Sequence, residues 1–242
     1  MEQLIFFGIL IFFFSAILQG LTGFGFSILA VPLITLLISP KTAVPILLLY
    51  SIIINLAVLY NTRNSVSIKN IWPFLLTGVI AMPFGTYLLV ALEEAILKIL
   101  IGVIILIFGF LLLMGFRKQF TKEKLAMLPI GFLSGILGGS ISVSGPPLII
   151  FLSNQNVNKN TFRGNLALYF LILNIFTLPV YLLNGLLTSE VWSYSLKFSP
   201  GLLIGVVLGN LLSHKVRESH FQQITLYLLI ILGTISIISS LS

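Results

Sequence analysis

The chain has 242 residues, of which 58% are hydrophobic and only 8% are charged, and its net charge is +7. Soluble domains of this size carry roughly a quarter charged residues, so the composition excludes a soluble protein. The chain has no cysteine, which excludes disulfides, thiolate catalysis and cysteine-ligated metal. Its basic residues lie in short loops and form no basic tail, so they predict membrane topology and contact with anionic lipid, and not nucleic-acid binding.

Apolar runs of about 20 residues, the length that spans a bilayer, recur along the whole chain. They predict an all-α polytopic protein, a multi-pass protein of the cell membrane, with a single transmembrane domain over residues 1–242. The expected helices are 4–19, 26–39, 42–60, 71–91, 95–115, 125–137, 146–153, 161–184, 199–213 and 221–240.

Glycine-rich breaks interrupt two of the apolar segments. The first reads GLTGFGFSILAVPLI at 20–34, and the second reads GILGGSISVSGPPLII at 135–150. Irregular backbone at membrane depth is costly unless it lines a cavity or is buried in protein. The glycines could instead serve only to let helices pack closely. We expect the two breaks to face each other at mid-membrane and to form the binding site of a transporter.

The second half of the sequence repeats the first. The matched pairs are Gly20 and Gly135, Gly23 and Gly138, Ser27 and Ser142, Pro32 and Pro147, Tyr50 and Tyr169, Asn55 and Asn174, Gly85 and Gly209, and Gly109 and Gly233. This ordered series predicts two repeats, residues 1–116 and 124–242, with about four transmembrane segments each. The first helix of each repeat is broken or re-entrant at its Gly-rich stretch.

Loop charges predict that the two repeats are inverted. Basic residues prefer the cytoplasmic side, which places the loops 61–69 and 117–124 inside and the Glu93–Glu94 turn outside. In the second repeat the signs change: the loop 183–190 has no basic residue, whereas 213–220 holds two. Each half then crosses the membrane an odd number of times, and both termini lie outside. Lys41, which falls outside, argues mildly against this topology.

The few polar residues near the breaks predict an anion site. The helix that begins after Ser144 with Pro146 and Pro147 presents a partially positive N-terminus. The candidate substrate-binding residues are Gln19, Thr22, Gly23, Gly25, Ser27, Asn55, Gly138, Gly139, Ser140, Ser142, Ser144, Gly145, Arg163 and Asn174. For Asn55 and Asn174 the alternative role is hydrogen bonding between helices, and for Arg163 it is a snorkelling interfacial anchor.

Catalytic and metal-binding patterns are missing from the sequence. There is no Asp, all six Glu residues lie at the N-terminus, in loops or at helix ends, and both His residues lie in one loop region. No proton relay, catalytic residue, metal site or cofactor is therefore expected. A site built from Gly, Ser and helix N-termini favours an anionic substrate over a cation.

At these residues the sequence resembles the sulfite exporter TauE/SafE family of membrane permeases. The resemblance rests on GLTGFGFSILAVPLI at 20–34, LSGILGGSISVSGPPLIIFL at 133–152 and FRGNLALYF at 162–170. Phe24 departs from the pattern, since a further glycine often stands at that position. The resemblance implies a plasma-membrane permease for small anions, often sulfur-containing ones such as sulfite, sulfoacetate or other organosulfonates.

The leading functional hypothesis is a secondary anion transporter that works by alternating access. It predicts that bulky replacements such as Gly139→Leu or Ser144→Leu abolish flux in protein that still inserts. A membrane structural or assembly protein, and a membrane-embedded enzyme, are the alternatives. The sequence leaves open which anion is carried, its direction, the coupling ion and the oligomeric state.

Overall fold

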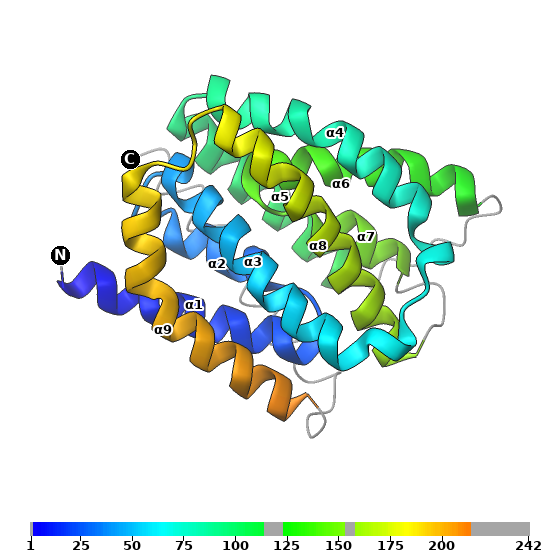
Figure 1. Cartoon of the computed structure of the whole chain (residues 1–242). Helices are drawn as coiled ribbons and strands as arrows, with labels where there is room; N and C mark the ends of the chain where they lie inside the picture. Colours follow the sequence, from blue (N-terminus) through cyan, green and yellow to red (C-terminus); the bar gives the residue numbers. More distant parts are fainter. Residues whose placement is uncertain (1, 114–122, 153–157, 214–242) are drawn as a thin grey trace.

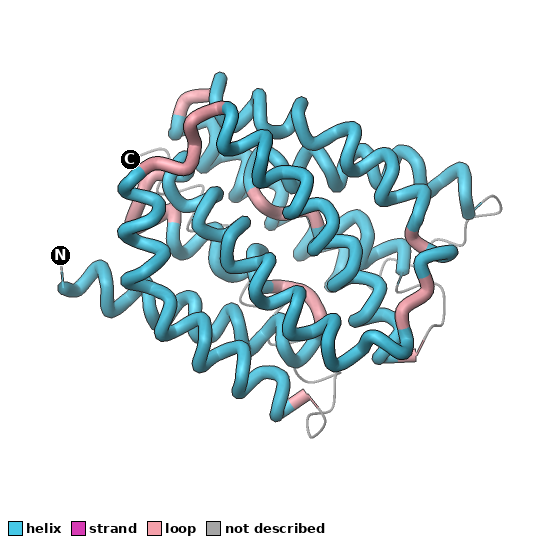
Figure 2. The backbone as a smooth tube through the Cα atoms, in the orientation of Figure 1, coloured by secondary structure: helices cyan, strands magenta, loops and turns pink. Residues whose placement is uncertain are grey.

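The computed structural model describes residues 2–113, 123–152 and 158–213, and these are helical throughout, without a β-strand (Figures 1 and 2). The helices are α1 (Glu2–Thr22), α2 (Phe26–Ile34), α3 (Pro40–Thr62), α4 (Trp72–Ala91), α5 (Glu94–Leu113), α6 (Glu123–Ile141), α7 (Gly145–Leu152), α8 (Lys159–Leu183) and α9 (Ser189–Leu212), with 3₁₀ turns at Arg63–Ser65 and Ile68–Asn70. In these ranges, seven helices are long and apolar enough to cross a membrane, all except α2 and α7. The predicted class, an all-α multi-pass membrane protein, is thereby confirmed.

The largest error in the predicted helices concerns α9. The sequence predicted its start at 199, but it begins at Ser189. Thr188 caps this helix by accepting a hydrogen bond of 3.3 Å from the Val191 amide, and Glu190 lies in the first turn, where acidic residues are favourable. The predicted helix 221–240 and the loop with His214 and His220 lie outside the described residues.

A second difference concerns α2, which ends at Ile34 although the prediction ran to 39. The Thr35 amide still bonds to the Val31 carbonyl at 3.1 Å, and the Thr35 hydroxyl donates to the same oxygen at 2.8 Å, after which the regular helix ends. A new helix, α3, then begins with Ser39 as its cap and Pro40 in its first turn, two residues that favour a helix start.

Three helix pairs dominate the packing of the described residues. Close glycine contacts show that α1 runs parallel to α9: Gly8 lies against Phe198, and a Cβ on Gly20 would come 2.7 Å from the Gly209 backbone. Similar contacts make α4 parallel to α6. The central pair, α3 and α8, is antiparallel, because Thr62 lies beside Gly164 at one end. Short Cα–Cα approaches of this kind are typical of membrane helices with small residues at the interface.

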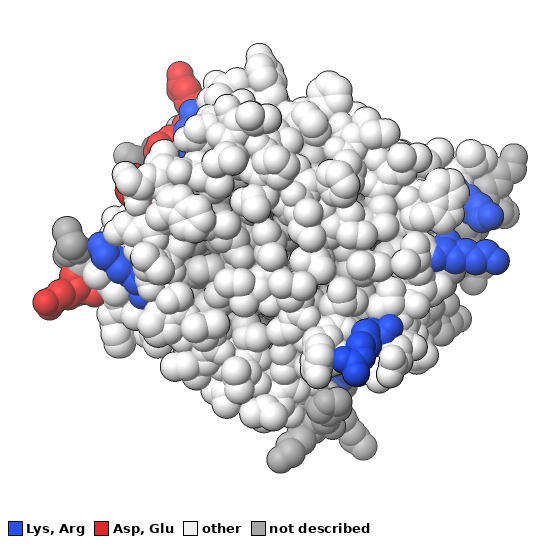
Figure 3. All heavy atoms as spheres, in the orientation of Figure 1, with Lys and Arg blue, Asp and Glu red and all other residues white. Residues whose placement is uncertain are grey.

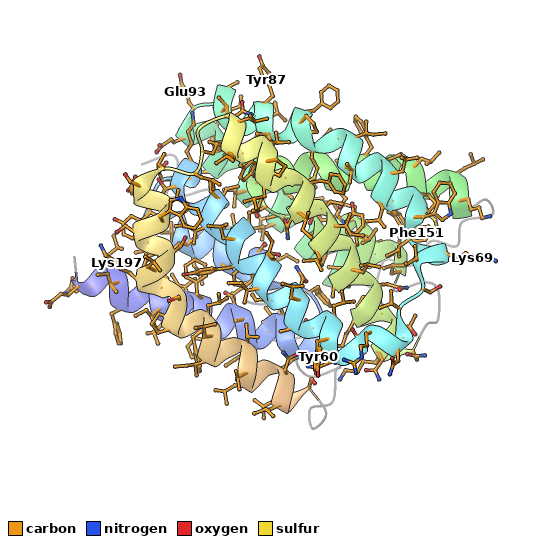
Figure 4. All side chains as sticks on the ribbon, viewed as in Figure 1. Tyr60, Lys69, Tyr87, Glu93, Phe151 and Lys197 are labelled. Carbon is orange, nitrogen blue, oxygen red and sulfur yellow. The ribbon has the colours of Figure 1, made fainter. Side chains whose placement is uncertain are left out.

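The charged side chains lie toward the two ends of the bundle (Figure 3). Ser39 donates a hydrogen bond of 2.5 Å to Glu94, and Lys41 donates one of 2.9 Å to the Val90 carbonyl, so these residues share one end. Figure 4 shows Glu93 and Lys69 at opposite ends of the molecule. Large apolar side chains cover the surface between the ends, for example Phe84. This pattern fits a bilayer whose normal runs along the helices.

Candidate functional site

The first break is a short turn between α1 and α2 that depends on glycine. Gly23 and Gly25 have φ angles of 84° and 97°, in the left-handed region that residues with a Cβ rarely adopt. The Thr22 hydroxyl braces the turn, 2.9 Å from the Leu18 carbonyl oxygen and 2.6 Å from that of Phe24. α2 packs against α1 after this turn.

The second break, between α6 and α7, makes a similar turn without glycine at its left-handed position. Ser142 takes this conformation, with φ 60°, and its amide donates a hydrogen bond of 3.1 Å to the Gly138 carbonyl. Ser134 fixes the far side of the turn through a bond of 2.5 Å from its hydroxyl to the Ser144 carbonyl. Tyr169 of α8 in turn donates to the Ser134 hydroxyl at 2.9 Å. This chain of bonds ties the second break to α8.

Both breaks open onto one cavity inside the bundle, and the short loop stretches in the middle of Figure 2 mark their positions. The cavity is lined by Gln19, Gly25, Ser27, Ile28, Ser51, Gly138, Ser142, Val143, Ser144, Gly145, Phe170 and Asn174. Its volume of about 20 Å³ has room for little more than water. Ser51 lies at the middle of α3, so the cavity lies about half-way along the spanning helices.

Most of the predicted site residues meet at this cavity. Those on its wall are Gln19, Gly25, Ser27, Gly138, Ser142, Ser144, Gly145 and Asn174. Sequence reasoning missed four further wall residues, Ile28, Ser51, Val143 and Phe170. Ser51 had a usable signal, because it precedes Asn55 by four residues and therefore lies on the same face of the helix. The apolar wall residues had none, since they resemble every other core position.

A chain of side-chain hydrogen bonds joins α1, α3 and α8 beside the cavity. Gln19 donates to the Asn55 side-chain oxygen at 2.7 Å, and Asn55 donates to the Ser51 hydroxyl at 2.9 Å. Asn174 donates to the same hydroxyl at 2.9 Å. The Gln19 oxygen also accepts from the Phe26 amide at 3.3 Å, at the start of α2. Both asparagines therefore bond between helices, and Asn174 lies on the cavity wall as well.

The cavity wall is rich in hydrogen-bond donors. The first amides of a helix have no partner inside the helix, and in α2 these include the amides of the wall residues Ser27 and Ile28. In α7 the corresponding positions are Pro146 and Pro147, which have no N–H. The second break instead contributes the hydroxyls of Ser142 and Ser144, which are wall residues. The starts of α2 and α7 thus differ, because only α2 has an N–H at these two positions.

The other predicted site residues lie beside the cavity and not on its wall: Thr22, Gly23, Asn55, Gly139, Ser140 and Arg163. Gly139 allows close packing of α6 on α4, since a Cβ there would come 2.6 Å from the Met82 carbonyl oxygen. The Ser140 hydroxyl is 2.7 Å from the Ile136 carbonyl oxygen of its own helix.

Arg163, near the start of α8, is 2% exposed. Its guanidinium donates a hydrogen bond of 2.5 Å to the Gly20 carbonyl in the last turn of α1. Gly23 lies directly against it, because a Cβ on Gly23 would come 2.9 Å from the Arg163 Cα. A cation at the C-terminal end of a helix is favourable, since the helix dipole is negative there. Arg163 is therefore a buried helix cap and not a snorkelling anchor.

The wall residues include no side chain that is charged at neutral pH. The described ranges also contain no group of three or more His, Cys, Asp or Glu residues that could hold a metal ion. What the cavity offers a ligand is amide N–H groups, serine hydroxyls and the Asn174 and Gln19 side chains.

Comparison with known proteins gives one match. The family model described as sulfite exporter TauE/SafE matches residues 8–235. No curated protein and no solved structure matches the chain.

Proposed function

Since the chain belongs to the sulfite exporter TauE/SafE family, whose members are transporters and not enzymes, we propose that it carries a small sulfur-containing anion through the cavity between its two breaks. The substrate is sulfite or an organosulfonate. The observation that carries the proposal is that both broken helices begin again at one cavity half-way across the bundle.

The chemistry of the wall supports an oxyanion as the ligand. Oxyanions need several hydrogen-bond donors, and the amides of Ser27 and Ile28 together with the Ser144 hydroxyl supply them from both breaks. A helix N-terminus adds a partial positive charge. No carboxylate lies on the wall to repel the anion or to attract a cation.

An inverted repeat is part of the proposal, and the helix ends support its register. α1 ends at Thr22 and α6 at Ile141, 119 positions later, and α2 and α7 begin at Phe26 and Gly145, again 119 apart. Tyr50 and Tyr169 have the same offset. The helix ends therefore favour an offset of 119 at the breaks, where the sequence alignment matched Pro32 with Pro147 at an offset of 115.

Reciprocal contacts support a two-fold relation between the halves. In the register of the helix ends Gly20 corresponds to Gly139, and the sequence alignment pairs Gly85 with Gly209 at an offset of 124. Gly20 contacts the Gly209 backbone, and Gly139 contacts that of Gly85. The pairs α1–α9 and α4–α6 are thus equivalent, and both are parallel, whereas the equivalent helices α3 and α8 are antiparallel. An antiparallel equivalent pair is what an axis in the membrane plane produces.

Transport in this proposal proceeds by alternating access. The cavity of about 20 Å³ has room for little more than water, so it must widen to admit an anion. Movement of one half against the other would open the cavity to each side in turn, as in other transporters built from inverted repeats.

The test is flux of labelled sulfite into proteoliposomes, compared with protein-free liposomes. The Ser144→Leu variant fills the cavity wall, and Ser199→Leu is its matched control on α9, away from the cavity. We expect flux in the wild type and in Ser199→Leu, and loss of flux in Ser144→Leu at equal insertion. Competition with sulfonates, thiosulfate and sulfate then ranks the anions. Normal flux in Ser144→Leu would show that the anion does not pass through this cavity.

A further inference from the structure

The two breaks bring four helix ends to the cavity, which raises the question of what sets its charge preference. α2 and α7 begin there with partially positive ends, but α1 and α6 end there with partially negative ones. Each end carries a charge equivalent of about half a unit, so the four cancel to about zero. Helix dipoles alone therefore give the cavity no preference for an anion.

Three carbonyls near the end of α1, however, have a donor within the protein besides the regular helix bonds. The Leu18 carbonyl is 2.9 Å from the Thr22 hydroxyl, and the Gln19 carbonyl accepts from the Gly23 amide at 2.7 Å. The third carbonyl, that of Gly20, accepts the guanidinium bond described above.

The corresponding carbonyls of α6 are covered in the same way. Those of Leu137 and Gly138 accept from the Val143 and Ser142 amides, at 3.3 and 3.1 Å. The carbonyl at position 139 accepts a hydrogen bond of 2.7 Å from the hydroxyl of Tyr181. Positions 20 and 139 are equivalent in the two halves, and both caps, Arg163 and Tyr181, are side chains of α8.

We propose that α8 sets the charge preference of the cavity by capping the equivalent carbonyls of Gly20 and Gly139 with Arg163 and Tyr181. Each cap covers one carbonyl at a negative helix end, while the amides at the start of α2 and the Ser144 hydroxyl stay available to a ligand. Neither cap lies on the cavity wall, so both are positioning residues that act through the helix ends. This inference rests on the proposed function and adds the residues that make the same site selective for anions.

The caps differ in strength. Arg163 brings a full charge into the protein, and it is the only charged side chain that is buried in the described ranges. Tyr181 brings only a hydroxyl dipole. Electrostatic effects are strong in a low-dielectric interior, so removal of the guanidinium should change anion binding more than removal of the hydroxyl.

The test compares two inhibitors of similar shape and different charge, methanesulfonate and dimethyl sulfone, in competition with sulfite uptake into proteoliposomes. The preference is the ratio of their inhibition constants. In Arg163→Met we expect the preference for methanesulfonate to fall on the order of tenfold. In Tyr181→Phe it falls a few-fold, and in Arg163→Lys, which keeps a charged donor, it stays near the wild-type value. Tyr50→Phe is the matched control, because the Tyr50 hydroxyl donates to the Ser195 carbonyl of α9, away from both breaks.

A purely structural role would weaken binding of both inhibitors alike, and an unchanged preference in Tyr181→Phe and Arg163→Met overturns the inference. If Arg163→Met does not insert, the near-isosteric Tyr181→Phe decides alone. If the wild type neither transports sulfite nor binds methanesulfonate, the proposed function fails. If the wild type does both and the variants keep its preference, only the capping role fails.

Discussion

Asn174 of α8 donates a hydrogen bond of 2.9 Å to the hydroxyl of Ser51 in α3. The same hydroxyl accepts from Asn55, so one oxygen joins the central helices of the two halves at the cavity wall. If the two halves move against each other during transport, one of the two hydrogen bonds to Ser51 must break or α3 and α8 must move together.

Replacement of Ser51 by alanine removes the acceptor of two amide groups. Leaving a buried donor without a partner costs about 1–3 kcal/mol, so we expect Ser51→Ala to lower both thermal stability and sulfite flux. Ser199→Ala on α9 is the control. Melting curves and proteoliposome flux measure the two effects, and unchanged flux in Ser51→Ala would argue that the junction is not on the pathway.

Substitutions at Ser142 can distinguish the effect of backbone strain on stability from the effect of its hydroxyl on ligand binding. At φ 60° a side chain is unfavourable, by roughly 1–2 kcal/mol, and glycine relieves this strain. Ser142→Gly should therefore keep or raise the melting temperature but weaken sulfite binding, because the cavity loses a hydroxyl. Ser142→Val, which is β-branched, should lower the melting temperature. Equal destabilisation by glycine and valine would contradict this account.

Gly20 and Gly139, which the proposed repeat makes equivalent, should respond alike to substitution. A Cβ would come 2.7 Å from the Gly209 backbone in one case and 2.6 Å from the Met82 carbonyl oxygen in the other. Backbone cannot yield cheaply, so Gly20→Ala and Gly139→Ala should each destabilise by about 1–3 kcal/mol. Yields and melting temperatures after detergent extraction test this. Tolerance of alanine at only one position would count against equivalent packing of the halves.

The larger substitution Gly139→Leu therefore has a different meaning from the one that the sequence suggested. Its side chain would strike α4, so loss of flux would follow from damaged packing and not from a blocked cavity. Ser144→Leu remains the informative variant, because Ser144 lies on the wall.

Transport should not require sodium. Backbone carbonyls at broken helices are the usual Na⁺ ligands in transporters of this architecture. Here those of residues 18–20 and 137–139 already have protein donors. We expect equal sulfite flux with Na⁺, K⁺ or choline as the cation at a clamped membrane potential. A strict Na⁺ requirement would show that a site exists elsewhere or that these caps open.

The glycine clusters allowed the sequence to predict both the breaks and most of the cavity wall. Composition and length of the apolar runs predicted the spans. The start of α9 was missed because Glu190 and Lys197 lower the local hydropathy, although Thr188 is a good helix cap. Arg163 was assigned to the substrate because sequence alone does not reveal that its guanidinium reaches Gly20, 143 positions away.

The alignment of the halves illustrates a different limit. Pro32 and Pro147 suggest an offset of 115, whereas the helix ends at the two breaks suggest one of 119. Proline is tolerated at more than one position of a short helix, so it is a weak marker of register. Ser142 has a positive φ angle, as Gly23 does 119 positions earlier, and residue identity alone does not reveal this shared backbone conformation.

The prolines at the start of α7 make the two breaks chemically unequal. Pro146 and Pro147 have no N–H, whereas Ser27 and Ile28 at the start of α2 have one each. An anion carried along the proposed pathway would therefore meet different donors at the two breaks. On that proposal, the substrate concentration that half-saturates the carrier should differ between the cytoplasmic and external faces, and the anion should pass more readily in one direction than in the other.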